Sequence, residues 1–284
     1  MKKIASLLLL SLLLVGCGNK TTTVSNQSDA VLTIGSYTLT HGDVYTALLS
    51  QNPAESVKFL ATQVILTKEV GLTDDIKAEA DQQLEDFKSS MGENAQMFLD
   101  YYGYKDFDDY YNQGILPTIQ QGILVNTYLT ANYDALAVDY QPKKVRIIEV
   151  TDASLADKAL EDIKAGKDFG SVASTYSTTS YSGSEQLVYT ASELPEVILT
   201  WMNLQTTPTL SPVLPDTTNA TNYIVQVTVS DASKIKDEVI ASFELDTTFM
   251  DIAIEDAFQR NEFTIYDKLI YDQFAASYPQ YLVK

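Results

Sequence analysis

Cysteine is almost absent from this sequence of 284 residues, in which Cys17 is the only one. No intrachain disulfide can form, and a body without cysteine suits an oxidising environment outside the cell. Basic residues are also scarce, because 19 lysines and arginines face 38 aspartates and glutamates, and the formal net charge is −19. So acidic a surface repels phosphate groups, which excludes nucleic acid as an expected partner.

The sequence also lacks an apolar run long enough to cross a bilayer, which takes about 20 residues. The segment from Ile4 to Val15 is almost entirely apolar, follows two lysines and ends in small residues, which is typical of a secretory signal peptide at 1–16. Its end, Leu14 to Cys17, resembles the lipobox of bacterial lipoproteins, in which the chain is cut before the cysteine and the thiol is acylated. We therefore predict lipidation of Cys17, which would anchor the mature protein to a cell membrane, rather than an inert buried cysteine.

The residues that follow the signal peptide predict a tether and then a helical region. Residues 17–29 are small and polar, and we expect a flexible tether there. Removal of the signal peptide leaves 17 basic and 38 acidic residues, so the mature net charge is −21. In residues 30–140, Thr40 and Asp43 have the spacing of a capping box, and apolar residues then recur at helical spacing.

A change of pattern near Gln141 predicts a segment that contains β-strands. Residues 143–150 and 223–229 are rich in β-branched residues and read as strands, with a helical pattern between them at 154–176. Helical spacing of apolar residues returns in 231–284. The order predicts an α+β protein in which a small β-containing insert at 141–230 interrupts a helical body.

This layout resembles the PrsA and PrtM family of extracellular foldase lipoproteins over nearly the whole chain. The segments that carry the resemblance are Tyr37–Thr40 with Val44 and Tyr45, Gly92–Asn94 with Phe98, Leu99, Gly103 and Tyr104, Ala165–Phe169 with Val172, Ala173, Tyr176 and Ser177, and Phe263–Lys268. The resemblance implies a mostly helical, SurA-like chaperone domain built from 30–140 and 231–284. It also implies that 141–230 is an inserted parvulin-like domain of FKBP-like topology, the family's peptidyl-prolyl isomerase module. With the anchor at Cys17, the resemblance implies a location on the extracellular face of the cell membrane of a Gram-positive type bacterium.

The residues that the family uses for isomerisation are missing from the insert. The family places two histidines in a hydrogen-bonded cluster, and those positions correspond to Ile147 and Tyr223 here, while the only histidine of the chain is His41. The family's glycine-rich loop is reduced to Gly183, and residues 184–284 contain no glycine. We therefore predict no catalytic residues, no cofactor and no metal.

An apolar groove is predicted to remain where the family binds its peptide. The candidate residues are Ile147, Tyr189, Leu194, Ile198 and Tyr223. Such a groove can hold an extended apolar peptide without a proton-sharing network. The first hypothesis is therefore a membrane-anchored chaperone whose partners are unfolded or partly folded secreted proteins, with a homodimer as a possible state. Two alternatives stay open. One is an active isomerase whose altered site uses Tyr189, Tyr223 and serine or threonine residues of the insert. The other is a solute-binding lipoprotein, whose expected two lobes of α/β repeats are not visible.

A run of aromatic residues between 101 and 111 is the second surface candidate. It contains Tyr101, Tyr102, Tyr104, Phe107, Tyr110 and Tyr111. Tyrosine offers broad, stiff contact area with a polar tip, which suits peptide binding. The spacing of the last three favours packing between helices for most of the run. The nearby aspartates at 106, 108 and 109 lack the glycine and glutamate of a calcium loop and are expected to form a solvated acidic face.

Overall fold

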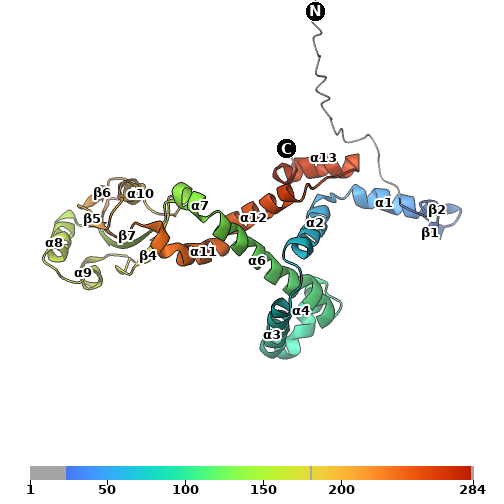
Figure 1. Cartoon of the computed structure of the whole chain (residues 1–284), viewed down its shortest axis with the longest axis horizontal. Helices are drawn as coiled ribbons and strands as arrows, with labels where there is room; N and C mark the ends of the chain where they lie inside the picture. The colour runs from blue at the N-terminus through green and yellow to red at the C-terminus, as the bar shows by residue number, and fades with distance from the viewer. Residues whose placement is uncertain (1–23, 180, 283–284) are drawn as a thin grey trace, which may run out of the picture. The chain divides into compact units, whose positions relative to one another are not determined.

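The computed structural model describes residues 24–179 and 181–282 (Figure 1). The predicted signal peptide and Cys17 lie outside these residues. The described chain forms two compact units, one containing residues up to Gln121 and from Ile254 onward, the other spanning Gly122–Ala253. Within the part of the chain that the structure describes, none of the helices combines the length and apolarity that crossing a membrane requires.

The first unit combines a β-hairpin with helices from both ends of the chain. Its elements are β1 Ala30–Ile34, β2 Tyr37–Thr40, α1 His41–Leu49, α2 Ala54–Glu69, α3 Asp74–Met91, α4 Ala95–Tyr102, α5 Phe107–Tyr110, the start of α6 Leu116–Ala131, the end of α12 Thr247–Arg260, and α13 Lys268–Ser277. A π-helical turn, Tyr111–Ile115, lies between α5 and α6. The capping box predicted at the start of α1 is present, with Thr40 and Asp43 bonded to each other's backbone. Residues 25–28, near the end of the predicted tether, form turns, and the carbonyl of Gln27 accepts a hydrogen bond from the N–H of Gly42 at 2.9 Å.

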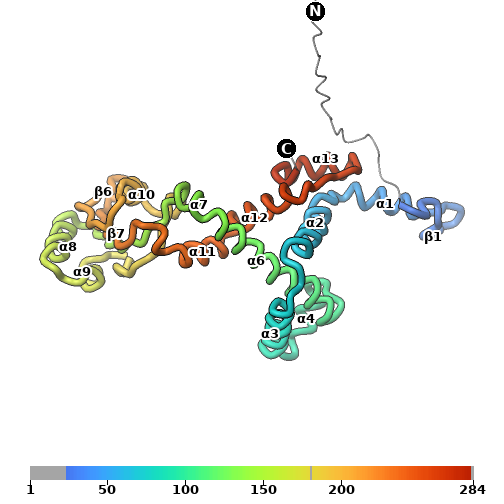
Figure 2. Tube along the Cα trace, viewed as in Figure 1, coloured from blue at the N-terminus to red at the C-terminus, as the bar shows by residue number. Residues whose placement is uncertain are grey.

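The two ends of the chain pack together within this first unit. Helix α13 lies against α2, and the red and blue parts of the trace run side by side there (Figure 2). The Gln273 side chain donates to the carbonyl of Leu49 at 3.1 Å, and Arg260 forms an ion pair with Glu69. The described residues up to Gln121 and those from Ile254 onward therefore build one body.

The second unit is organised around an antiparallel sheet. Its elements are α7 Tyr133–Tyr140, β3 Lys143–Val150, α8 Ala153–Lys164, α9 Phe169–Tyr176, β4 Gln186–Val188, α10 Glu196–Asn203, β5 Thr209–Leu210, β6 Leu214–Asp216, β7 Thr221–Val229 and α11 Lys236–Glu244, with the adjoining parts of α6 and α12. The strand order is β4-β3-β7-β5, and β6 also pairs with β7. Both predicted strands exist and pair with each other, with Ile147 opposite Val225 and Glu149 opposite Tyr223.

Helices cover both faces of this sheet, so its two central strands are buried on both sides. Ile148, Val150 and Ile224 pack under α8 and α9, and residues of the opposite face pack under α10. A third core joins α6, α7, α11 and α12, with Phe243 and Phe249 stacked at a centroid distance of 3.8 Å. All of the sheet lies inside the predicted insert at 141–230. That residues 141–230 form a domain separate from the flanking helices stays a prediction.

Gly183, which remains from the expected glycine-rich loop, has a structural role. Its φ of +73° is a conformation that side chains rarely adopt, and a Cβ there would lie 2.7 Å from the Cβ of Ala173 on α9. The backbone therefore passes this helix at a distance that only glycine permits.

Asp152 begins α8 and makes part of the stability of the second unit depend on pH. Its carboxylate accepts hydrogen bonds from the N–H of Ser154 at 2.8 Å, from the Ser154 hydroxyl at 2.6 Å and from the N–H of Leu155 at 3.0 Å. These bonds, that of the hydroxyl first, lower the pKa of Asp152 below its usual 3.8. Since the folded pKa is depressed, this stabilisation is present above the unfolded pKa and is lost as pH falls through the folded value.

Replacing Asp152 by asparagine should flatten the acid side of the stability profile. Asparagine is an equally good N-cap but does not titrate, so the free energy of unfolding should fall less between about pH 5 and pH 2 than in the wild type. Urea unfolding followed by circular dichroism at several pH values measures the difference. Asp157→Asn, at an exposed position of the same helix, is the matched control. Parallel profiles for the wild type and Asp152→Asn would show that the cap carries no pH dependence.

Candidate functional site

Helix α10 places one row of side chains on the sheet and an adjacent row beside it. Ile198 and Met202, four residues apart, are fully buried against Val145 and Val225 of the central strands. Val197 and Trp201 each precede one of these residues by one position, so they lie at the side of the contact. The same helix therefore anchors itself and presents an apolar edge.

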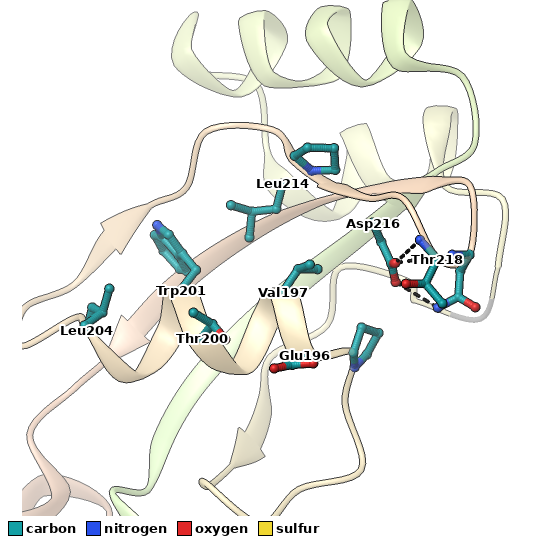
Figure 3. Close-up of a pocket in the computed structure, with 11 residues that line it drawn as sticks. Glu196, Val197, Thr200, Trp201, Leu204, Leu214, Asp216 and Thr218 are labelled. Atoms are coloured by element: carbon teal, nitrogen blue, oxygen red, sulfur yellow. Dashed lines mark hydrogen bonds between the residues drawn. The ribbon is translucent and has the colours of Figure 1, made fainter.

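That edge forms one wall of a pocket, which we call the α10 pocket (Figure 3). Its volume is about 670 Å³, within the range of ligand sites. Val197, Thr200 and Trp201 line it from α10, Leu204 lines it just after the helix ends, and Leu214 faces them from β6. The remaining lining residues are Pro195, Glu196, Pro215, Asp216, Thr218 and Asn219. The pocket thus combines one indole and several aliphatic groups with a few polar groups near one end.

Asp216 holds the turn at the polar end of the α10 pocket. Its carboxylate accepts hydrogen bonds from the N–H of Thr218 at 3.0 Å and from the N–H and side-chain amide of Asn219 at 3.2 and 2.8 Å. The Asn219 side-chain bond is the main reason that the pKa of Asp216 lies below its usual range. Since its oxygens already accept three bonds, Asp216 shapes the wall more than it offers a free charge. Across the described residues, His, Cys, Asp and Glu side chains never gather in threes in a way that would hold a metal ion.

The five predicted groove residues occupy two different clusters. Ile147, Ile198 and Tyr223 are buried in the core between α10 and the sheet, and Leu194 packs against that core while partly exposed. Tyr189 lies in the other cluster, with its ring 5.3 Å from that of Phe243. None of the five lines the α10 pocket, although the first three form the core on which α10 rests. Their contact with a peptide stays a prediction.

The residues that do line the α10 pocket were missed because the segment before β7 shows no clear periodicity. A signal was nevertheless present, since Trp201 is the only tryptophan of the chain and follows Val197 by one helical turn. Pro195 just before the helix also marks its start.

Tyr223 does not offer a base at neutral pH. Burial raises its pKa to about 12, with a further contribution from Glu149, which lies directly opposite on β3. The phenol is therefore protonated and can donate a hydrogen bond, but it is not ionised to accept a proton. Ile147 has no polar group, and His41 belongs to the first unit. The second unit consequently contains no imidazole.

The first unit presents an apolar surface of its own on α2. Phe59, Leu60 and Val64 are 50%, 62% and 67% exposed. Val64 also lines a cleft of about 230 Å³ between α2 and the Asn261–Phe263 segment. Exposed apolar groups on one helix are typical of surfaces that bind other chains.

Comparison with solved structures identifies the fold of this chain. The peptidylprolyl isomerase PrsA from Bacillus cereus matches with a TM-score of 0.54 at 19% sequence identity, over 88% of this chain and 98% of that one. The chain has the PrsA fold. This confirms, at the level of the fold, the resemblance and the α+β class expected from the sequence.

Other PrsA structures match less closely in space. The foldase protein PrsA from Streptococcus pneumoniae matches with a TM-score of 0.47 at 21% identity, over 89% of this chain and all of that one. PrsA from Bacillus subtilis matches with a TM-score of 0.40 at 18% identity, over 88% and 100%. No protein-family model matches the chain, and no curated protein does.

Proposed function

We propose that the protein is an extracellular chaperone that binds apolar segments of unfolded or partly folded secreted proteins, without efficient prolyl isomerase catalysis. The observation that carries the proposal is the α10 pocket, an open apolar site in a unit without imidazole. The PrsA fold supports it, because the solved neighbours with this fold are described as foldases or peptidylprolyl isomerases.

The lining of the α10 pocket suits an extended peptide. Proline-containing segments dock in grooves lined by aromatic residues, and Trp201 supplies a broad apolar ring with one N–H donor. Leu204 is 75% exposed, which extends the apolar surface beyond the pocket. Binding here needs only apolar contact and a hydrogen bond, so loss of the histidines does not prevent it.

Catalysis makes a greater demand than binding. Rotation about a prolyl amide has a barrier of about 20 kcal/mol, and the family's histidine cluster has no counterpart near Ile147 and Tyr223. A specific observation favours the alternative, an altered isomerase, since the Tyr223 hydroxyl stays protonated and could donate to the substrate. Tyr223 is only 4% exposed, however, so a substrate would reach it only after local rearrangement.

Two assays on the purified protein distinguish the chaperone from the isomerase. We expect it to suppress aggregation of an unfolded secreted enzyme, and to leave the cis/trans rate in a protease-coupled proline assay unchanged from the uncatalysed rate. Tyr223→Phe, which removes only the hydroxyl, is the matched variant. A cis/trans rate above background that disappears in Tyr223→Phe would establish isomerase activity. Suppression of aggregation no better than that by an inert acidic protein would refute the chaperone function.

We further propose that lipid on Cys17 anchors the protein to the outer face of the cell membrane. The proposal rests on the signal-like segment at 1–16 and the lipobox-like residues before Cys17. An anchor at this position, followed by a polar segment, would hold an acidic body near secreted chains as they emerge. Palmitate labelling that Cys17→Ala abolishes would support this anchor.

A further inference from the structure

Helix α4 of the first unit presents two aromatic rings to solvent at its C-terminal end, beside the partly buried rings of α3 and α5. Tyr101 and Tyr102 at the end of α4 are 81% and 61% exposed, and Met97, one turn before Tyr101, is 66% exposed. We call Met97, Asp100, Tyr101 and Tyr102 the Tyr101 surface. The sequence predicted that most of the aromatic rings between residues 101 and 111 pack between helices. The other four rings of that run are partly buried, as this prediction requires: Tyr104, Phe107, Tyr110 and Tyr111.

Rings behind the Tyr101 surface support it. The ring of Tyr102 lies 4.5 Å from that of Phe98, which lies 5.0 Å from that of Phe87 on α3. Tyr101 packs edge-on against Tyr102 at 5.0 Å. These contacts hold the exposed rings as a platform, so a ligand would not have to order them from free rotation.

The surroundings of this platform are strongly acidic. Between Asp74 and Asp109 the chain has 11 acidic residues and 3 basic ones. Two of the three lysines are already paired within α3, Lys77 with Asp74 and Lys88 with Glu85. The carboxylate of Asp100, adjacent to Tyr101, is held in place by the side-chain amide of Gln96, which donates to it at 2.8 Å.

The same aromatic cluster already binds a cation of this chain. The Nζ atom of Lys88 lies 5.3 Å from the ring centroid of Phe107, and it pairs with the carboxylate of Glu85 at 2.9 Å. The Phe107 ring in turn lies 6.5 Å from that of Phe87. A cation that rests on a ring next to a carboxylate is thus an arrangement that this part of the fold stabilises.

We propose that the Tyr101 surface binds cationic segments of polypeptides, with arginine preferred over lysine. The aliphatic part of an arginine would pack on Met97, its guanidinium would stack on Tyr101 or Tyr102, and Asp100 would accept a charge-assisted hydrogen bond. The negative field of α3 to α5 would attract such segments and repel acidic ones. This goes beyond the proposed function, because it adds a charge-selective surface in a different unit from the apolar α10 pocket.

Two labelled peptides test this proposal on the full purified protein. One has arginine at every third position of a glycine-serine chain, and the other has glutamine at those positions. By fluorescence anisotropy at low salt, we expect the arginine peptide alone to bind. The double variant Tyr101→Ala/Tyr102→Ala should weaken its binding about five- to ten-fold, as expected for two exposed cation–π contacts. Asp100→Asn should weaken it less and reduce its salt dependence.

Two further variants make the result specific. Tyr266→Ala changes a tyrosine that is 76% exposed elsewhere in the first unit and should leave the affinity unchanged. Tyr101→Leu/Tyr102→Leu keeps apolar side chains without π faces, and should weaken binding as much as the double alanine variant does. Equal binding of both peptides, or full affinity in the double variant, would overturn the proposal. Those outcomes would leave binding at the α10 pocket intact, so the two proposals can fail separately.

Discussion

With alanine in place of Trp201, the affinity for an apolar proline-containing peptide is expected to fall about thirty-fold. The reason is that Trp201 supplies the only aromatic ring of the α10 pocket. Removal of a buried aromatic anchor from a binding site typically costs about 2 kcal/mol, which corresponds to that factor. Fluorescence anisotropy of a labelled leucine- and proline-rich peptide measures the change.

The wild-type protein provides an independent signal for the same event. Trp201 is the only tryptophan of the chain, so a shift of its emission on peptide addition reports on this pocket alone. Trp201→Phe keeps a ring and should lose only about three- to five-fold in affinity. An unchanged emission spectrum at saturating peptide would locate the binding elsewhere.

Because Trp201 also packs against the core under α10, a second variant separates binding from folding. Leu204→Glu changes an exposed residue of the pocket wall. It should lower the affinity for the peptide without lowering the melting temperature of the protein. Leu245→Glu is the matched control, since Leu245 is 87% exposed and does not line the α10 pocket. If both glutamates weaken binding equally, charge rather than the pocket explains the loss.

The elements that the sequence predicted best are those with strong local signals. The capping box at Thr40 and Asp43 forms through hydrogen bonds between residues three apart, so the local sequence determines it. The β-branched runs of β3 and β7 were found from their residue types alone, although the hydrogen bonds that pair them join distant segments. The α+β class followed from the change of pattern near Gln141.

The candidate site was harder to predict, because its residues become neighbours only through tertiary contacts. Ile147 and Tyr223 were located correctly on the central strands. Helix α10 covers them, and this helix was not predicted from the residues before β7. Tyr189 follows the short strand β4, where packing against Phe243 rather than any local pattern decides its direction. A helix of eight residues contains too few positions for periodicity to identify it.

The π-helical turn at Tyr111–Ile115 illustrates the same limit. Gly114 lies under the Tyr110 ring, and a Cβ there would come within 2.9 Å of that ring. No propensity scale predicts such a turn, since it arises where packing requires one extra residue in a helix.

Replacing Phe243 by alanine is expected to destabilise the second unit by about 3–5 kcal/mol, as for other fully buried phenylalanines. Its ring is 1% exposed, stacks on Phe249 and lies 5.5 Å from the ring of Tyr140. The loss of stability should appear as a lower urea midpoint. It is also large enough to show which residues unfold together with Phe243, and so to test the insert boundaries of 141–230 that the sequence predicted.

Hydrogen exchange in Phe243→Ala distinguishes the two possible boundaries. Tyr189 contacts Phe243 directly, and Lys144 of β3 pairs with Glu238 of α11 at 2.6 Å, so the helices are bonded to the sheet. We therefore expect amides of β3 and β7 to lose protection together with those of α11. Phe274→Ala, an equally buried phenylalanine of the first unit, is the control and should leave the sheet protected. Protection retained in β3 and β7 while α11 exchanges would instead show that the sheet and its covering helices fold as an independent insert.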